Sequence, residues 1–401
     1  MKRVLLVDDE KQILRALSRV FLESPYSIYT AESGEEALAI LDEQKIDMIV
    51  SDMRMPYMNG YQLLNKVKVR HPNIIRLLLS GYSEENTILK ALNENVAKTF
   101  IFKPWENEQL LLLVDKTFKV YESMENKDIA QFVNNIGTIP VLEGNHKSLL
   151  QALEESNNLE KISCIVKKDQ AISAKILRIA QSSYYQKRDK TKALKVEEAI
   201  EDIGAKNFKM LVDKTSTCDY CHEKHSEYIR EIWTQSLISN KLVSRFYKTM
   251  MHKQPPSLAL VAGALHNIGM LLMFKRYKME YLSLFAESIK KRKTIEQKEV
   301  ELFGISHGEI GSYLLDWWEF PHGVVEAAMY HHSPTEKAVV NKKLVHIIHL
   351  VNYYTFKLMG IENYSRLDTE VFTKLDVSQR KWEKEFAKIK KERWYDCEQK
   401  I

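Results

Sequence analysis

Cysteine is scarce in this sequence, with four residues in 401. We therefore expect no disulfide framework, as is usual for cytosolic proteins. No stretch suggests a membrane-spanning helix, and no membrane partner is expected. The N-terminal apolar run is short and ends at Asp8 and Asp9, which indicates a strand rather than a signal peptide. These absences favour a cytoplasmic protein.

The chain also lacks a strong charge bias. Its formal net charge is +5, which is small for this length and does not indicate nucleic-acid binding. No basic recognition helix stands out, and the basic runs lie among glutamates, as on a solvated helix face. There is no internal repeat and no Gly/Ser-rich linker. A chain of this length is expected to form two or three domains.

The first 122 residues alternate between short apolar or β-prone runs and helical patterns. This alternation predicts a parallel sheet covered by helices on both faces, in a flavodoxin-like doubly wound α/β domain. The predicted strands are Val4–Val7, Ile28–Ala31, Met48–Ser51, Leu77–Ser80 and Thr99–Phe102, and the predicted helices are Lys11–Leu22, Gly34–Asp42, Gly60–Arg70, Glu84–Leu92 and Asn107–Tyr121.

Polar residues stand at the ends of four of these strands. Asp8 and Asp9 follow the first strand, Asp52 follows the third, Ser80 ends the fourth and Lys103 follows the fifth. The carboxyl ends of parallel strands meet at one edge, so these side chains should converge. Clustered carboxylates need a counterion, and Mg²⁺ is a cation that prefers oxygen ligands. The set suits transfer of a phosphoryl group to Asp52.

These residues resemble the receiver domain of two-component response regulators. The matching motifs are Val7-Asp8-Asp9-Glu10, Ser51-Asp52-Met53-Arg54-Met55-Pro56 with Asn59-Gly60, Leu79-Ser80-Gly81, and Phe102-Lys103-Pro104. The resemblance implies phosphorylation on Asp52 by a cognate histidine kinase. It implies that Asp8, Asp9, Asp52 and the backbone carbonyl of Arg54 hold Mg²⁺. Ser80 and Lys103 would bind the phosphoryl group, and Phe100 would be the switch aromatic.

After about Asp128 the strand pattern disappears and apolar residues recur at helical spacing, which predicts an all-helical region. This region resembles the HDOD domain, a degenerate relative of the HD metal-dependent phosphohydrolases. The residues that carry this resemblance are Ile139-Pro140-Val141, Ile172–Ala180, Val196–Ile200, Ile232–Ser236, Leu265-His266-Asn267-Ile268-Gly269, Ile305–Gly311, Trp317, Pro321 and Tyr330–Pro334.

The resemblance places a degenerate HD pocket at Gln235, His266, Asn267, His307, His331, His332 and Asn352. A metal hydrolase needs carboxylates that bind metal and activate water. Amides replace the expected ligands at Gln235, Asn267 and Asn352. We therefore predict no catalytic residue and no metal in this domain, although weak metal binding by the remaining histidines is an alternative. Cys218 and Cys221, in a Cys-X-X-Cys-His run, leave a second metal site open.

The sequence therefore predicts a response regulator with a receiver at 1–122, a helical connector at 123–128, and an HDOD domain with a C-terminal helical extension at 129–401. A non-catalytic HDOD domain would act through an unknown protein partner, and the receiver would dimerise or dock through its fourth helix, fifth strand and fifth helix. Two alternatives remain: a metal-dependent phosphohydrolase acting on nucleotides or cyclic dinucleotides, and a nucleic-acid-binding output.

Overall fold

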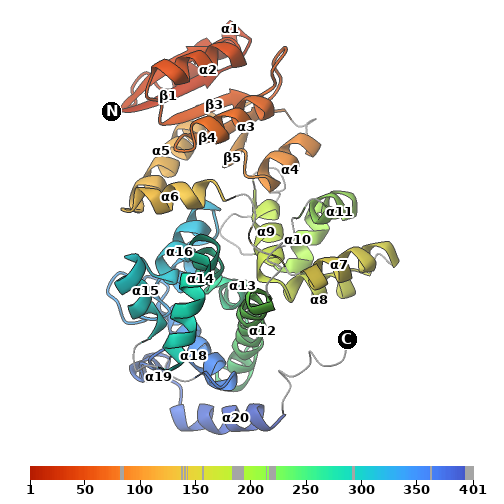
Figure 1. Cartoon of the computed structure of the whole chain (residues 1–401), viewed down its shortest axis with the longest axis vertical. Helices are drawn as coiled ribbons and strands as arrows, with labels where there is room; N and C mark the ends of the chain where they lie inside the picture. The colour runs from red at the N-terminus through yellow and green to blue at the C-terminus, as the bar shows by residue number, and fades with distance from the viewer. Residues whose placement is uncertain are drawn as a thin grey trace. The chain divides into compact units, whose positions relative to one another are not determined.

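The structure is a computed structural model of the whole chain (Figure 1), and it describes residues 1–81, 85–136, 139, 141, 143–155, 158–182, 194–213, 215, 223–290, 294–361 and 364–392. The chain divides into two compact units. The first is Met1–Thr138 with Ser182–Gln186 and Lys206–Lys214, and the second is Ile139–Gln181, Lys187–Ala205 and Thr215–Ile401.

The first unit contains a five-stranded parallel sheet in the order β2-β1-β3-β4-β5. This is the predicted doubly wound α/β fold. Its elements are β1 (Lys2–Val7), α1 (Lys11–Val20), β2 (Tyr26–Ala31), α2 (Gly34–Glu43), β3 (Met48–Asp52), α3 (Gly60–Arg70), β4 (Ile75–Ser80), α4 (Glu85–Asn93), β5 (Thr99–Phe102), α5 (Asn107–Ser123) and α6 (Lys127–Asn134).

The order of the strands determines which helices share a face. The β1-to-β2 connection moves along the sheet in one direction, and the later connections move in the other. With right-handed crossovers, α1 must lie on one face and α2, α3 and α4 on the opposite face. Contacts between α1 and α5, and between α2 and α3, agree with this arrangement. Strands β3 and β4 are buried along their whole length, as expected for a sheet covered on both sides.

The connector differs from the expectation of an uninterrupted helix. Helix α5 ends at Ser123, and Met124 has extended backbone angles (φ −84°, ψ 109°). Asn126 then caps a separate helix, α6, by accepting hydrogen bonds from the backbone amides of Asp128 and Ile129. Helix α6 lies in the same compact unit as the sheet. The predicted domain boundaries at 122 and 129 stay predictions, but a rigid extension of α5 is not observed.

All elements described in the second unit are helices, which confirms the all-α prediction. They are α7 (Glu143–Glu155), α8 (Leu159–Lys167), α9 (Gln170–Gln181), α10 (Val196–Ile203), α12 (Glu223–Met250), α13 (Ser257–Leu265), α14 (Ile268–Lys290, kinked at Lys278), α15 (Ile295–Phe303), α16 (His307–Trp317), α17 (His322–Tyr330), α18 (Lys342–Leu358), α19 (Glu370–Lys374) and α20 (Gln379–Glu392); helix α11 (Ala205–Asp213) falls almost wholly in the first unit.

The core of the second unit is formed by α12, α13, α14, α16, α17 and α18, which pack on one another. Helix α20 joins this core through Trp382, whose side chain is fully buried and stacks edge-on against Phe246 and Tyr354. The C-terminal helical extension is therefore packed against the α12 and α18 helices rather than separate from the domain.

One apolar stretch corrects the expectation that no segment could span a membrane. Ser257–Phe285, which contains α13 and most of α14, is long and apolar enough to do so by length and composition. However, 78% of the most apolar part of this stretch is buried inside the unit. It packs against α12, α16, α17 and α18, which is the environment of a core helix.

Helices α14 and α16 cross at glycines. A Cβ atom on Gly269 would lie 1.8 Å from the carbonyl oxygen of His307 and 2.9 Å from the amide nitrogen of Gly311. Only a residue without a side chain allows the backbones to approach this closely. Gly269 follows His266 and Asn267 by a few residues, so this contact fixes the spacing between that motif and His307.

We expect Gly269→Ala to lower the stability of the second unit by about 1–3 kcal/mol, because the added methyl group must push α14 away from α16. The control is Gly144→Ala in α7, where nothing lies within 4 Å of the added atom; it should change stability by less than about 1 kcal/mol. Denaturant unfolding followed by tryptophan fluorescence measures this, since five of the six tryptophans lie after residue 230. Equal stabilities for the two variants would contradict the argument.

Candidate functional site

The carboxyl ends of β1, β3 and β5 bring three predicted residues together. In the parallel register, Val7 pairs with Ser51, so Asp8 and Asp52 end neighbouring strands. The ammonium of Lys103 lies 2.8 Å from Asp8 Oδ2 and 2.5 Å from Asp52 Oδ1. Both carboxylates are buried, with exposed fractions of 1% and 5%. The predicted convergence of Asp8, Asp52 and Lys103 is observed.

Backbone amides hold the two buried carboxylates in place. The amide of Arg54 donates to Asp52 Oδ2 at 2.9 Å, and the amide of Glu10 donates to Asp8 Oδ1 at 2.9 Å. Each carboxylate therefore has one oxygen on a backbone amide and the other on Lys103. Gly60 makes this packing feasible, because a Cβ at that position would lie 2.1 Å from the carbonyl oxygen of Asp52.

Burial dominates the electrostatics of Asp52. Desolvation raises the pKa of its carboxyl group, the neighbouring Asp8 raises it further, and the hydrogen bond and charge of Lys103 oppose the rise. For Lys103, burial lowers the pKa of the ammonium, but Asp52 and Asp8 outweigh burial and raise it overall. Lys103 therefore stays charged and links two carboxylates that would otherwise repel each other.

The donor set fits a magnesium ion. Asp8, Asp9 and Asp52 supply three carboxylates against the single ammonium of Lys103, which leaves two negative charges to be balanced. Asp9 is exposed to solvent, so a hydrated cation can reach the group. Mg²⁺ prefers one or two carboxylates together with water. Asp8, Asp9, Asp52 and the carbonyl of Arg54 are the residues that would hold it.

The two predicted switch residues lie on β4 and β5. Ser80 ends β4, is 1% exposed, and its hydroxyl donates to the carbonyl of Gly81 at 3.1 Å. The ring of Phe100 is also 1% exposed and packs edge-on against Phe102, with ring centroids 5.7 Å apart. The Phe100 ring is thus buried in this structure, and its role as the switch aromatic stays a prediction.

The structure shows one feature of the receiver unit that the sequence analysis missed. The segment after α6 is held against the start of β4 and the α4–β5 loop. Arg76 in β4 donates to the carbonyls of Val96 and Ile74, both at 2.8 Å, and to Asn135 Oδ1 at 3.1 Å. Burial lowers the pKa of this guanidinium to about 10. A charged residue in an otherwise apolar strand was the sequence signal for this contact.

Asn95 holds the same segment from the α4–β5 loop. Its side-chain amide donates to the carbonyl of Asn134 at 2.8 Å and to that of Ile136 at 3.1 Å. Asn95 has a φ of +51°, in the left-handed region that asparagine tolerates better than most residues. The segment that leaves the receiver unit at the end of α6, Asn134–Ile136, is therefore attached to β4 and to the α4–β5 loop. We call it the exit segment.

In the second unit, the predicted pocket divides into two side-chain groups. The amide group comprises Gln235, His266, Asn267 and Asn352, all of which are buried. Asn267 Nδ2 donates to Asn352 Oδ1 at 3.0 Å, and His266 Nδ1 lies 3.0 Å from the carbonyl of Gly263. Burial lowers the pKa of His266 to about 4, so its imidazole is neutral. This group offers amide oxygens and a neutral ring, and no carboxylate.

The imidazole group comprises His307, His331 and His332. The Nε2 atom of His307 lies 3.3 Å from that of His331 and 3.1 Å from that of His332. Glu299, which is fully buried, lies 2.6 Å from His307 Nδ1. Burial opposes protonation of His307, but the Glu299 carboxylate outweighs it and raises the pKa; burial lowers the pKa of His331 and His332 well below the usual value.

Glu299 was missed by the sequence analysis, although its carboxylate lies 2.6 Å from the ring of a predicted pocket residue, His307. It lies in α15, eight residues before His307, and it also accepts a hydrogen bond from the amide of His307 and from the hydroxyl of Tyr281. A glutamate on a surface-like helical pattern gave no signal of burial. Cys218 and Cys221 lie outside the described residues.

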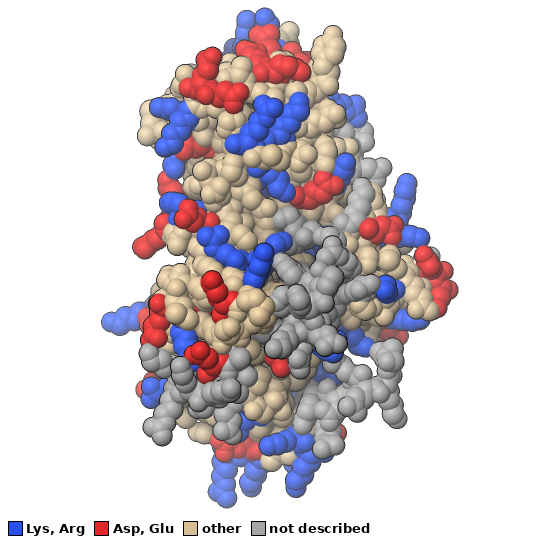
Figure 2. All heavy atoms as spheres, viewed as in Figure 1, with Lys and Arg blue, Asp and Glu red and all other residues tan. Residues whose placement is uncertain are grey.

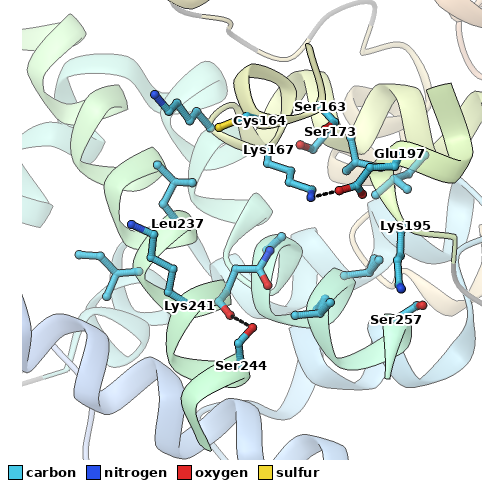
Figure 3. Close-up of a pocket in the computed structure, with 18 of the residues that line it drawn as sticks. Ser163, Cys164, Lys167, Ser173, Lys195, Glu197, Leu237, Lys241, Ser244 and Ser257 are labelled. Carbon is cyan, nitrogen blue, oxygen red and sulfur yellow. Dashed lines mark hydrogen bonds and ion pairs between the residues drawn. The ribbon is translucent and has the colours of Figure 1, made fainter. Parts of the chain in front are cut away.

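A separate pocket of about 800 Å³ lies among α8, α9, α10, α12 and α13 (Figure 3). Apolar residues such as Leu177, Leu237 and Leu260 line it, with Lys195 and Lys241 among its polar residues. Lys167 points across it and pairs with Glu197. None of the residues of the amide or imidazole groups lines this pocket.

Two protein-family models match the chain along most of its length. The response regulator receiver domain matches residues 4–115, and the HDOD domain matches residues 139–334. The chain is a receiver–HDOD fusion. The receiver thus includes the carboxylate pocket, and the HDOD match includes all members of the amide and imidazole groups except Asn352.

Curated relatives share only part of their length with this protein. The hydrogenase transcriptional regulatory protein HoxA of Cupriavidus necator is 31% identical over 40% of this chain and 33% of its own length. The response regulator protein FleR of Pseudomonas aeruginosa is 33% identical over 28% of this chain and 24% of its own. The receiver–HDOD chain therefore spans about a quarter to a third of the length of these relatives.

Solved structures give similar partial matches. The signal receiver domain of an HD domain-containing protein from Pseudomonas fluorescens Pf-5 is 30% identical and covers 31% of this chain and 98% of its own, with a TM-score of 0.30. The MmoQ response regulator from Methylococcus capsulatus is 15% identical and covers 62% of this chain and 98% of its own, with a TM-score of 0.48.

Proposed function

We propose that this protein is a response regulator that accepts a phosphoryl group on Asp52 and signals through protein contacts of a non-catalytic HDOD domain. The observation that supports the first part most strongly is the Lys103 ammonium held between Asp8 and Asp52 in a buried receiver pocket. That arrangement places a nucleophilic carboxylate beside a cation able to neutralise a transferred phosphoryl group.

Transfer would replace one bond to phosphorus with another. A carboxylate oxygen of Asp52 attacks the phosphorus atom, the bond to the histidine nitrogen of the kinase breaks, and an acyl phosphate forms. The Lys103 ammonium can then pair with a phosphoryl oxygen, and the Ser80 hydroxyl can turn from Gly81 to donate to another. Mg²⁺, held by Asp8, Asp9, Asp52 and the Arg54 carbonyl, would neutralise charge on the phosphoryl oxygens.

We expect incubation with acetyl phosphate and Mg²⁺ to add one phosphoryl group per chain, measured by intact mass. Asp52→Ala should abolish the addition, because it removes the nucleophile. Lys103→Met should slow it by roughly tenfold or more, because it removes the cation that faces the transferred group. As a control, Lys11→Met alters an exposed lysine of α1 and should react normally. Unchanged stoichiometry in Asp52→Ala would refute the assignment.

The composition of the amide group supports a non-catalytic HDOD domain. An amide oxygen carries no negative charge to hold a catalytic metal ion as a carboxylate does, and it cannot act as a general base. Gln235, Asn267 and Asn352 stand at positions where hydrolysis would need ionisable groups, and they bond to one another in the closed core. The rival assignment is a metal-dependent phosphohydrolase acting on nucleotides or cyclic dinucleotides.

We expect no turnover of cyclic dinucleotides or nucleotide phosphates with Mn²⁺, Fe²⁺ or Ni²⁺ supplied. The Asn267→Asp variant restores one carboxylate, and comparing its turnover with that of the natural protein shows how much activity this one ligand adds. Hydrolysis by the natural protein above background, lost in His266→Ala, would establish the phosphohydrolase instead.

The attachment of the exit segment, Asn134–Ile136, suggests how a structural change caused by phosphorylation is passed to the HDOD domain. Ser80 is at one end of β4, and Arg76, which holds Asn135, is near the other end of the same strand. Asn95 ties Asn134 and Ile136 to the loop between α4 and β5. We propose that a shift of β4 and this loop is passed directly to the segment entering the HDOD domain. A bias of about 1–3 kcal/mol between two arrangements is enough for regulation.

We expect beryllofluoride, which mimics the phosphoryl group, to change the solution scattering profile of the natural protein. Asn95→Gly should reduce that change while leaving phosphorylation of Asp52 intact; glycine removes the side chain without straining the positive φ. Gln109→Ala, an exposed change on α5, is the matched control. Because α5 already ends at Ser123, a Gly-Gly replacement at Ser123-Met124 should have little effect. Loss of the response in that variant, but not in Asn95→Gly, would show that α5 carries the signal.

The remaining partner proposals follow from the same assignment. The cognate histidine kinase is the phosphoryl donor, an unidentified protein binds the HDOD domain, and a second receiver docks through the face of α4, β5 and α5. On the face shown in Figure 2, basic and acidic side chains are intermingled, which does not favour nucleic acid as the target. A cytoplasmic location is consistent with this role.

A further inference from the structure

Three histidines in the HDOD domain direct the same ring atom toward one another. His307 begins α16, His331 follows α17 and His332 is the next residue. The Nε2 atoms of His331 and His332 lie 3.3 and 3.1 Å from that of His307, and all three lie within 4.8 Å of one another. His307 and His331 are fully buried. Among the described residues, the hydrogen-bond contacts of these Nε2 atoms are those between the histidines themselves.

The opposite nitrogens of the two buried rings fix the direction of this convergence. His307 Nδ1 faces the Glu299 carboxylate at 2.6 Å, and His331 Nδ1 faces the carbonyl of Ala328 at 2.8 Å. Both partners can only accept hydrogen bonds, so Nδ1 of each of these rings carries a hydrogen and Nε2 is the nitrogen left to face an ion. Nitrogens at this spacing need either a proton on one ring or a metal ion between them.

We propose that His307, His331 and His332 bind one divalent transition-metal ion through their Nε2 atoms. The spacing supports this, since nitrogens at 2.0–2.1 Å from a tetrahedral ion lie about 3.3 Å apart. Imidazole ligands suit zinc, iron, cobalt or nickel rather than magnesium. Glu299 and the Ala328 carbonyl occupy the positions of the acceptors that usually orient metal-bound histidines. Three protein ligands leave at least one coordination position for water.

A pocket lies beside the imidazole group, lined by residues next to two of the histidines in sequence. It has a volume of about 570 Å³, and its lining includes Ser306 and Tyr330, the residues that precede His307 and His331. Glu296, Glu301 and Glu309 also line it, so its carboxylates attract positive ions to this side of the domain. His332 is only partly buried, which leaves one ligand accessible from outside.

This inference revises the expectation that the HDOD domain holds no metal. The amide substitutions remove ligands from the side of the pocket formed by Gln235, Asn267 and Asn352. They do not touch the imidazole group, which has its own buried carboxylate in Glu299. The proposal does not depend on phosphorylation of Asp52.

The test uses full-length protein carrying Cys218→Ser and Cys221→Ser, with excess Mg²⁺ present for the receiver. Removing the two thiols excludes a zinc site in that run. The apo protein is titrated with Zn²⁺ or Co²⁺, and bound metal is measured by elemental mass spectrometry after desalting. We expect one ion per chain, and with Co²⁺ the visible absorption bands of a nitrogen-ligated ion.

His332→Ala should abolish stoichiometric binding, because it removes the most accessible ligand. Glu299→Gln keeps a hydrogen-bond acceptor of the same size and should weaken affinity by about 10- to 100-fold. His322→Ala, on an exposed histidine of α17, is the control and should bind normally. Circular dichroism checks that the variants are folded, and acetyl phosphate labelling tests the receiver separately.

The absence of bound metal in the thiol-free protein would overturn the proposal, as would undiminished Co²⁺ absorption in folded His332→Ala. In the first case, a proton shared among the three rings is what offsets their lone pairs. Failure of Asp52 labelling with normal Co²⁺ binding would refute the proposed phosphorylation of Asp52 alone.

Discussion

The ammonium of Lys103 lies within hydrogen-bonding distance of two buried carboxylates, Asp8 and Asp52, which end neighbouring strands. Without a cation, two carboxylates this close and this well buried could not both remain ionised. The requirement determines much of the receiver around it. Lys103 must follow β5, backbone amides must hold the other carboxylate oxygens, and Gly60 must leave room beside the carbonyl of Asp52. The carboxylates of Asp8, Asp9 and Asp52 outnumber the ammonium of Lys103, and the proposed binding of Mg²⁺ rests on this excess of negative charge.

The HDOD domain also buries polar side chains, and it does so in two groups that are stabilised differently. In the amide group, neutral side chains and a neutral His266 bond to one another, but Gln235 Oε1, Asn267 Oδ1 and Asn352 Nδ2 are buried without a hydrogen-bond partner. In the imidazole group, Glu299 orients His307, and the Nε2 atoms of three histidines face one another. A buried arrangement of this kind is costly unless a proton or a metal ion lies between the nitrogens. The two groups lie side by side, with the rings of His266 and His331 5.1 Å apart, yet they differ in the chemistry they can support.

Close backbone contact connects these sites to the rest of each unit. Gly269 lets α14 lie directly on the start of α16, which sets His307 opposite the residues that follow α17. In the receiver, Arg76 and Asn95 attach the exit segment to β4 and to the α4–β5 loop, so the site and the outgoing chain share one strand. Packed elements move as bodies rather than deform continuously, which is the physical basis of the proposed coupling.

Much of this protein could be predicted from its sequence. Alternating strand and helix patterns predicted the doubly wound sheet, and placing Asp8, Asp52 and Lys103 at strand ends predicted their meeting, because parallel strands share one carboxyl edge. The all-helical second half and its amide substitutions were equally local signals. Three features depended on tertiary structure. The break after α5 was hidden because Ser123-Met124-Glu125 contains no helix breaker. The burial of Glu299 was hidden because its helix has the pattern of an exposed one. The focus of three imidazoles on one point requires α15, α16 and the end of α17 to pack together, and no spacing along the chain encodes that distance.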